Sequence, residues 1–183
     1  GYTNAGKSSL LNALCCRNPG LAVLAENKLF ATLDPTTRRL SLPQTSAAPK
    51  EVLMTDTVGF IRELPKPLLE AFRATLEETR EADLLLLVVD LADPDWQSQL
   101  EAVHQLLDGL SCDQLRKVVA NQIDRCDAAA IETIRTLEPD VIYLSATEGT
   151  GLKGLRNWLE KQFWDDAATP ESFTQQRSFP DHG

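Results

Sequence analysis

The sequence has no long apolar run, no excess of basic residues and no C-x-x-C pair of cysteines. Its longest apolar run, Leu84 to Val89, is far shorter than the roughly 20 residues of a bilayer-spanning helix, and no basic-then-apolar leader stands at the front. Lys and Arg number 18 against 27 for Asp and Glu, and the resulting net charge of −9 repels phosphate backbones. We therefore expect a soluble protein that does not coat nucleic acid nonspecifically.

The four cysteines, Cys15, Cys16, Cys112 and Cys126, form neither a C-x-x-C pair nor a cluster. This spacing argues against a zinc site or a disulfide framework and favours reduced thiols in the cytoplasm. The length of 183 residues, with 43% hydrophobic and 25% charged residues, is typical of one globular domain. The apolar pattern ends after Trp164, so we expect a domain over residues 1–165. Residues 166–183 would be a polar tail or the start of a truncated C-terminal region.

Apolar, β-rich runs alternate with stretches of helical period, which is the pattern of a sheet covered by helices. The expected strands are 38–42, 52–56, 83–90, 117–121 and 141–145. The expected helices are 6–16, 68–82, 96–110, 128–137 and 152–163. Strands 83–90 and 117–121 are apolar almost throughout, as in strands buried on both faces of a parallel sheet. The fold class predicted is α/β, with three layers, a mostly parallel sheet and helices on both faces.

The first eight residues, Gly1-Tyr2-Thr3-Asn4-Ala5-Gly6-Lys7-Ser8, match the pattern G-x-x-x-x-G-K-[ST] of a phosphate-binding loop. Glycines let the backbone approach phosphate oxygens with its N–H groups, and the positive end of the following helix faces the same anion. Lys7 would add a charge at the outer phosphates, and the Ser8 hydroxyl can ligate Mg²⁺. An ordinary glycine turn before a helix is the competing interpretation of this segment alone.

Asp56-Thr57-Val58-Gly59 supplies a carboxylate at the end of an apolar strand, where a nucleotide site needs one for its magnesium shell. Gly59 would leave its backbone N–H free to meet a γ-phosphate. An isolated D-x-x-G also fits a common turn. Its place after a strand and after the phosphate loop favours the functional interpretation.

Two later segments predict the base. Asn121-Gln122-Ile123-Asp124 follows a strand, and the Asp124 carboxylate can accept from guanine N1–H and its 2-amino group, whereas adenine has no such amine. A strand-ending turn is the alternative for Asn121 and Asp124. Ser145-Ala146-Thr147 could then present a backbone N–H to guanine O6. The order of the four segments is far more specific than any one of them.

In the order and the amino-acid sequence of these motifs, the chain resembles the translation-factor-related GTPases, and its motifs are similar to those of the HflX family of ribosome-associated GTPases. The resemblance covers about residues 1–163. It is carried by the loop Gly1–Ser8 and by three further phrases, which are Leu29-Phe30-Ala31-Thr32-Leu33-Asp34-Pro35-Thr36, Asp56-Thr57-Val58-Gly59-Phe60-Ile61 with Leu64-Pro65, and Ala71-Phe72 through Thr75-Leu76-Glu77-Glu78-Thr79.

The resemblance implies a GTPase that cycles between GTP and GDP with Mg²⁺ and binds the large ribosomal subunit, splitting or rescuing stalled ribosomes. It implies catalytic roles for Lys7, Thr32 and Gly59, with Ser8, Thr32 and Asp56 at the metal. Phe30, Ala31, Thr32, Leu33 and Asp34 join the GTP-binding residues by the same resemblance, although sequence pattern alone leaves Thr36 and Thr37 open as the switch threonine. A cytoplasmic monomer is expected.

The chain departs from the family pattern in two places, and a third position bears on turnover. Gln122 replaces the usual lysine of N-K-x-D, which predicts weaker nucleotide affinity with guanine selectivity kept by Asp124. No apolar strand precedes Gly1, so we expect a domain that lacks the first strand of its sheet. Phe60 occupies the position where many small GTPases have a water-orienting glutamine. A packing role for its side chain, as a core anchor for the switch segment, is the competing interpretation. A phenyl ring cannot orient water, so hydrolysis should be slow without a partner.

Two other functions stay open at this point. An ATP-using P-loop protein would share the phosphate loop but would not need Asp124. A regulatory module that holds GTP or GDP with little turnover would fit Phe60 and Gln122. Arg38, Arg39 and Arg62 are available cations, but solvated surface charges are the simpler interpretation of each.

Overall fold

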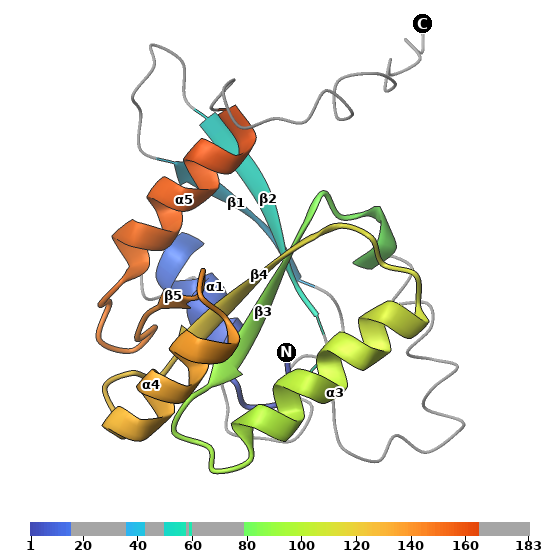
Figure 1. Ribbon diagram of the computed structural model, residues 1–183. Helices are drawn as coiled ribbons and strands as arrows, with labels where there is room; N and C mark the ends of the chain where they lie inside the picture. The colour runs from blue at the N-terminus through green and yellow to red at the C-terminus, as the bar shows by residue number, and fades with distance from the viewer. Residues whose placement is uncertain (16–35, 43–49, 58, 60–78, 165–183) are drawn as a thin grey trace, which may run out of the picture.

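The structure is a computed structural model, and it describes residues 1–15, 36–42, 50–57, 59 and 79–164 (Figure 1). The elements in chain order are α1 (Lys7–Cys15), β1 (Thr36–Leu42), β2 (Lys50–Asp56), β3 (Leu84–Asp90), α3 (Trp96–Gly109), β4 (Leu115–Asn121), α4 (Ala128–Leu137), β5 (Ile142–Tyr143) and α5 (Leu152–Trp164). The predicted strands and four of the five predicted helices are present, with ends within three residues of those expected. Of the predicted helix 68–82, only its end is described, and residues 79–81 are helical.

The described strands form two sheets. β1 and β2 pair antiparallel, with Thr36 opposite Asp56 and Leu42 opposite Lys50. β3, β4 and β5 form a parallel sheet in which Asp90 lies opposite Asn121. The parallel register matters for function, because it places the carboxyl ends of these strands at one edge of the sheet, where open α/β sheets bind ligands.

A cavity of about 540 Å³ lies between β2 and β3 and is lined by residues of both strands and of α1. Within the described residues, β2 pairs only with β1, and β3 pairs only with β4, so each presents an edge to this cavity.

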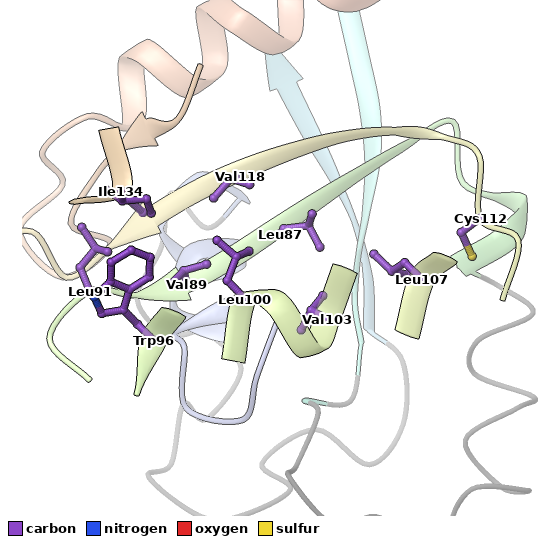
Figure 2. Close-up of a cluster of buried hydrophobic side chains, with 11 residues drawn as sticks. Leu87, Val89, Leu91, Trp96, Leu100, Val103, Leu107, Cys112, Val118 and Ile134 are labelled. Carbon is purple, nitrogen blue, oxygen red and sulfur yellow. The ribbon is translucent and has the colours of Figure 1, made fainter. Parts of the chain in front are cut away.

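Two hydrophobic clusters cover the two faces of the parallel sheet. On one face, Leu87 and Val89 of β3 pack with Leu100, Val103 and Leu107 of α3, as Figure 2 shows. Figure 2 also shows Trp96 at the start of α3 and Ile134 of α4 beside the same strands.

On the other face, Val88 of β3 and Val119 of β4 join Leu10 and Leu14 of α1 and Leu155 of α5. Successive residues of β3 thus point to opposite layers. The predicted three-layer α/β architecture, with helices on both faces, is confirmed.

Candidate functional site

The segment Gly1–Ser8 forms a tight loop that leads into α1. Asn4 (φ 63°) and Gly6 (φ 86°) both adopt left-handed backbone conformations, and Ala5 N donates to Tyr2 O at 3.4 Å. α1 begins at Lys7, and its first turn leaves backbone N–H groups without partners inside the helix. The loop and the helix end therefore form a surface of N–H groups that suits an anion.

Gly6 lies against the side chain of Asn121. A Cβ placed on Gly6 would come within 2.2 Å of Asn121 Nδ2, so a larger residue cannot occupy this position without displacing that amide. The positive φ of Gly6 excludes a side chain for a second, independent reason. The second glycine of the predicted loop is thus required by both its backbone conformation and its neighbour.

Lys7 is folded back over the loop, where its Nζ donates to Tyr2 O at 2.8 Å. Burial lowers the pKa of Lys7 to about 8, and the nearby carboxylate of Asp56 offsets part of that effect by raising the pKa. An ammonium group in this position lacks the water that would normally solvate it, so an added phosphate would meet a poorly solvated cation.

Ser8 and Asp56 are in direct contact. Ser8 Oγ donates to Asp56 Oδ2 at 2.5 Å, and Asp56, the last residue of β2, is only 5% exposed. The described residues contain no group of three or more His, Cys, Asp or Glu side chains that could hold a metal ion. A hydroxyl and one carboxylate are nevertheless hard oxygen donors of the kind that Mg²⁺ uses when water and phosphate complete its shell, so this pair fits the predicted metal.

Gly59 lies beside the phosphate loop. A Cβ on Gly59 would approach Thr3 Cα to 2.5 Å and Lys7 Nζ to 2.8 Å, and the residue is buried. Thr57, just after β2, is half-buried. The structure thus brings the D-x-x-G segment to the phosphate loop. Val58, Phe60 and Arg62 lie outside the described residues, as do Phe30, Ala31, Thr32, Leu33 and Asp34, and their predicted roles stay predictions.

Asn121 connects the phosphate loop to the predicted base segments. It is 2% exposed, its Nδ2 donates to Ala5 O at 3.0 Å, and its Oδ1 accepts from Ala146 N at 3.0 Å. One side chain therefore links parts of the chain that are 116 and 25 residues away. A buried amide that is satisfied at both ends fixes the spacing between the two segments.

The segment after Asn121 turns sharply. Gln122 has a φ of 60°, Ile123 N donates to Leu144 O at 3.4 Å, and Arg125 N donates to Gln122 O at 2.9 Å. Asp124 is exposed at the outside of this turn. An exposed carboxylate at the carboxyl end of β4 is where the sequence predicts recognition of a base.

The segment Ser145–Thr147 lies next to this turn. Ser145 N donates to Thr150 O at 3.0 Å, and Ser145 Oγ accepts from Glu148 N at 3.1 Å. Ala146 N donates to Asn121 Oδ1. In the part of the chain that the structure describes, the Thr147 N–H has no acceptor, so of the three predicted N–H donors it is the one that could meet a base oxygen.

Sequence reasoning missed two residues of the site. Asp90 ends β3, and its Oδ1 accepts from Ala92 N at 2.8 Å while its Oδ2 accepts from Gln122 Nε2 at 2.5 Å. Burial raises the pKa of Asp90, although the Ala92 N–H bond acts in the opposite direction. Arg125 Nη1 donates to Gln122 Oε1 at 2.7 Å. The signal that could have revealed Asp90 is its place as the last residue of the predicted strand 83–90, because Asn121 ends the predicted strand 117–121 in the same way.

Together these contacts place an anion-binding loop, a lysine, a hydroxyl–carboxylate pair and a buried amide beside the exposed Asp124. Such an arrangement can hold a phosphate chain at one end and a polar base at the other.

Comparison with protein families supports this description. A family model described as "50S ribosome-binding GTPase" matches residues 1–122. A GTPase HflX of Lacrimispora saccharolytica is 49% identical over 162 residues, covering 87% of this chain and 36% of that protein. A GTPase HflX of Escherichia coli is 40% identical over 171 residues, covering 92% of this chain and 38% of that protein. The chain thus spans little more than a third of the length of these relatives.

Solved structures share the fold. Era of Aquifex aeolicus bound to GDP and AlF₄⁻ matches with a TM-score of 0.68 at 24% identity, covering 86% of this chain and 53% of that one. A complex of Era with MgGDPNP and a segment of 16S ribosomal RNA matches with a TM-score of 0.65 at 25% identity, covering 98% of this chain and 57% of that one. Among the described residues, no helix has the length and apolar character needed to cross a membrane.

Proposed function

The chain belongs to the family of 50S ribosome-binding GTPases and carries the GTPase domain of the HflX proteins, and from this we propose that it binds GTP with Mg²⁺ and hydrolyses it as a switch. The observation that carries the proposal is the Asn121 amide, which is hydrogen-bonded to the phosphate loop at Ala5 and to the base segment at Ala146. Through these two hydrogen bonds Asn121 holds the phosphate loop and the proposed base-binding segment at a fixed distance from each other.

In this proposal the loop residues Gly1–Ser8 wrap the phosphates with their N–H groups. Lys7 exchanges its bond to Tyr2 O for phosphate oxygens and neutralises charge that develops on them during hydrolysis. Gly59, which lies against Thr3 and Lys7, presents its N–H to the γ-phosphate. By the family resemblance, Thr32 adds its hydroxyl when GTP is bound.

Ser8 and Asp56 are the described residues that would hold Mg²⁺, Ser8 by direct ligation and Asp56 through the metal's water shell. When bound, the metal neutralises phosphate charge. The Ser8 hydroxyl donates to Asp56 at 2.5 Å, which keeps the two oxygens together on the side of the loop that faces β2.

Base recognition is assigned to Asp124 and Thr147. The Asp124 carboxylate accepts from guanine N1–H and the 2-amino group, and the Thr147 N–H donates to O6. Adenine offers an acceptor and no amine to the same carboxylate, so GDP should bind far more tightly than ADP. Equal binding of the two would favour an ATP-using protein instead.

We expect Asp124→Asn to shift the preference from guanine toward xanthine nucleotides, because an amide can donate to the 2-oxygen of xanthine. Competition of GDP and XDP against a fluorescent guanine nucleotide measures the shift. Asp127→Asn is a matched control, since Asp127 is also an exposed aspartate in this region but caps α4 by accepting from Ala130 N at 2.7 Å. An unchanged preference in Asp124→Asn would show that the base lies elsewhere.

We further propose that the protein acts on the large ribosomal subunit in the cytoplasm, in splitting or rescue of stalled ribosomes. The matching family description supports the subunit. Among the described residues, Cys15, Cys112 and Cys126 form no disulfide, and disulfides are rare in cytoplasmic proteins. Cosedimentation with isolated large subunits in a non-hydrolysable GTP analogue, but not in GDP, is the expected result.

A second function is a guanine-nucleotide module with little turnover, which Phe60 and Gln122 favour. Single-turnover hydrolysis of GTP, measured with and without ribosomes, separates the two. Acceleration by ribosomes supports the switch. The same slow rate in both conditions supports the binding module.

A further inference from the structure

Three side chains form a continuous chain of hydrogen bonds beside the base segment. Gln122 Nε2 donates to Asp90 Oδ2 at 2.5 Å, and Gln122 Oε1 accepts from Arg125 Nη1 at 2.7 Å. The Asp90 carboxylate is itself held by Ala92 N, which donates to its other oxygen at 2.8 Å. This series of hydrogen bonds therefore connects the end of β3, the residue after β4 and the turn that precedes α4.

The amide of Gln122 matches the two groups on either side of it. Asp90 offers an acceptor and Arg125 offers a donor, and a glutamine side chain has one donor end and one acceptor end. A lysine at position 122 could donate to Asp90 but would repel Arg125. A glutamate would accept from Arg125 but would repel Asp90.

The backbone of Gln122 also adopts an uncommon conformation. Gln122 has a φ of 60°, in the left-handed region that residues with a Cβ seldom adopt. Arg125 N donates to the Gln122 carbonyl oxygen at 2.9 Å, so Gln122 and Arg125 are joined by both backbone and side chain. Ile123 and Asp124 lie between these two joined residues.

The orientation of the Asp124 carboxylate depends on this backbone arrangement. Its carboxylate is exposed and accepts no hydrogen bond from the residues that the structure describes. The backbone on either side is therefore what aims it, and that backbone is fixed by Asn121 before it and by the Gln122–Arg125 connection around it.

We propose that Asp90, Gln122 and Arg125 are positioning residues that aim the Asp124 carboxylate at the 2-amino group of a guanine base. The inference rests on the proposed function. In this proposal the three side chains affect how strongly the site prefers guanine over other bases. They do not affect phosphate binding, because the phosphate loop is held by Asn121.

The test compares GDP with IDP, which lacks the 2-amino group. The ratio of the IDP to the GDP dissociation constant measures what that amine contributes, while the phosphates contribute equally to both. We expect Gln122→Ala and Arg125→Ala each to lower this ratio by roughly tenfold, because GDP loses a hydrogen bond from its 2-amino group to the charged Asp124 that IDP never makes. IDP keeps only the N1–H bond to Asp124, so its affinity should fall less than that of GDP. The double variant should lower it no further than the single variants, since the contacts lie in series.

Arg135→Ala is the matched control. Arg135 also donates from Nη1 on the surface, to Glu132 Oε2 at 3.0 Å on α4, and its removal changes the net charge by the same amount as Arg125→Ala. The control should keep the wild-type ratio, which separates positioning from a general loss of positive charge near an anionic ligand.

Two results overturn the inference while the proposed function stands. One is a wild-type protein that prefers GDP to IDP and keeps that ratio in all variants. The other is an equal loss of GDP and IDP affinity in Gln122→Ala and Arg125→Ala, which would mean a general structural role. A wild-type protein that binds GDP no more tightly than ADP or IDP would overturn the proposed function, and the inference with it.

Discussion

Replacement of Asn121 by alanine tests the connection between the phosphate loop and the base segment most directly. The change removes a donor to Ala5 O and an acceptor from Ala146 N. Ala5 is 1% exposed and Ala146 is half-buried, so neither group gains full access to water. A buried polar group that loses its partner costs about 1 to 3 kcal/mol, and we take the lower half of that range for the two groups together, about 2 to 4 kcal/mol.

The loss should appear in stability and in binding. For a domain of this size, 1 kcal/mol shifts the melting temperature by about 2 to 4 °C, so Asn121→Ala should melt at least about 4 °C below wild type in the absence of nucleotide. The dissociation constant for GDP should rise at least about tenfold, because the two halves of the site lose their common anchor. Differential scanning calorimetry and titration with a fluorescent GDP measure these quantities.

Asn157→Ala serves as the control, because Asn157 is an exposed asparagine on α5 and the chemical change is the same. A surface change of this kind should stay within about 0.5 kcal/mol. Asn121→Asp separates the two bonds, since a carboxylate can still accept from Ala146 N but sets a negative charge against Ala5 O. Melting within about 1 °C of wild type, with unchanged GDP affinity, would refute the assigned role of Asn121.

Two further predictions concern the phosphate end of the site. Because burial lowers the pKa of Lys7 to about 8 from the usual 10.5, the unfolded chain binds more protons than the folded one between these values, and the stability of the nucleotide-free protein should rise with pH from about 8 to 10.5. Nucleotide phosphates favour the charged lysine, so GDP binding at pH 9 should take up protons, and calorimetry in two buffers of different ionisation enthalpy that detects no uptake would contradict the assignment. Gly59→Ala should weaken GTP analogues more than GDP, because its Cβ would lie 2.5 Å from Thr3 Cα and 2.8 Å from Lys7 Nζ; equal losses for both nucleotides would place Gly59 away from the γ-phosphate.

Much of the fold was predictable from local sequence. Apolar runs such as 84–89 specify strands buried on both faces, and the stripe Leu100, Val103 and Leu107 specifies a helix packed on them. The phosphate loop was recognisable because close approach of backbone to an anion needs glycine at fixed spacing. These signals depend only on residues that are close together in the sequence, so they can be recognised without knowledge of the tertiary contacts.

Boundaries and edges were less predictable. The expected strand 141–145 is reduced to β5, Ile142–Tyr143, because Ser145 N turns away to Thr150 O instead of continuing the ladder. The antiparallel pairing of β1 and β2 also had no local signature, since strand direction is set by the path of the whole chain.

The sequence by itself determined which residues are the candidates for the chemistry, through the spacing of Gly1–Ser8, Asp56 to Gly59, and Asn121 to Asp124. Tertiary structure alone decided how those residues are held. The contacts of Asn121 with Ala5 and Ala146, and of Gln122 with Asp90, join residues that are far apart along the chain. They exist because parallel strands bring their carboxyl ends to one edge, and pairing at that edge depends on the register of β3 with β4, which no local pattern encodes.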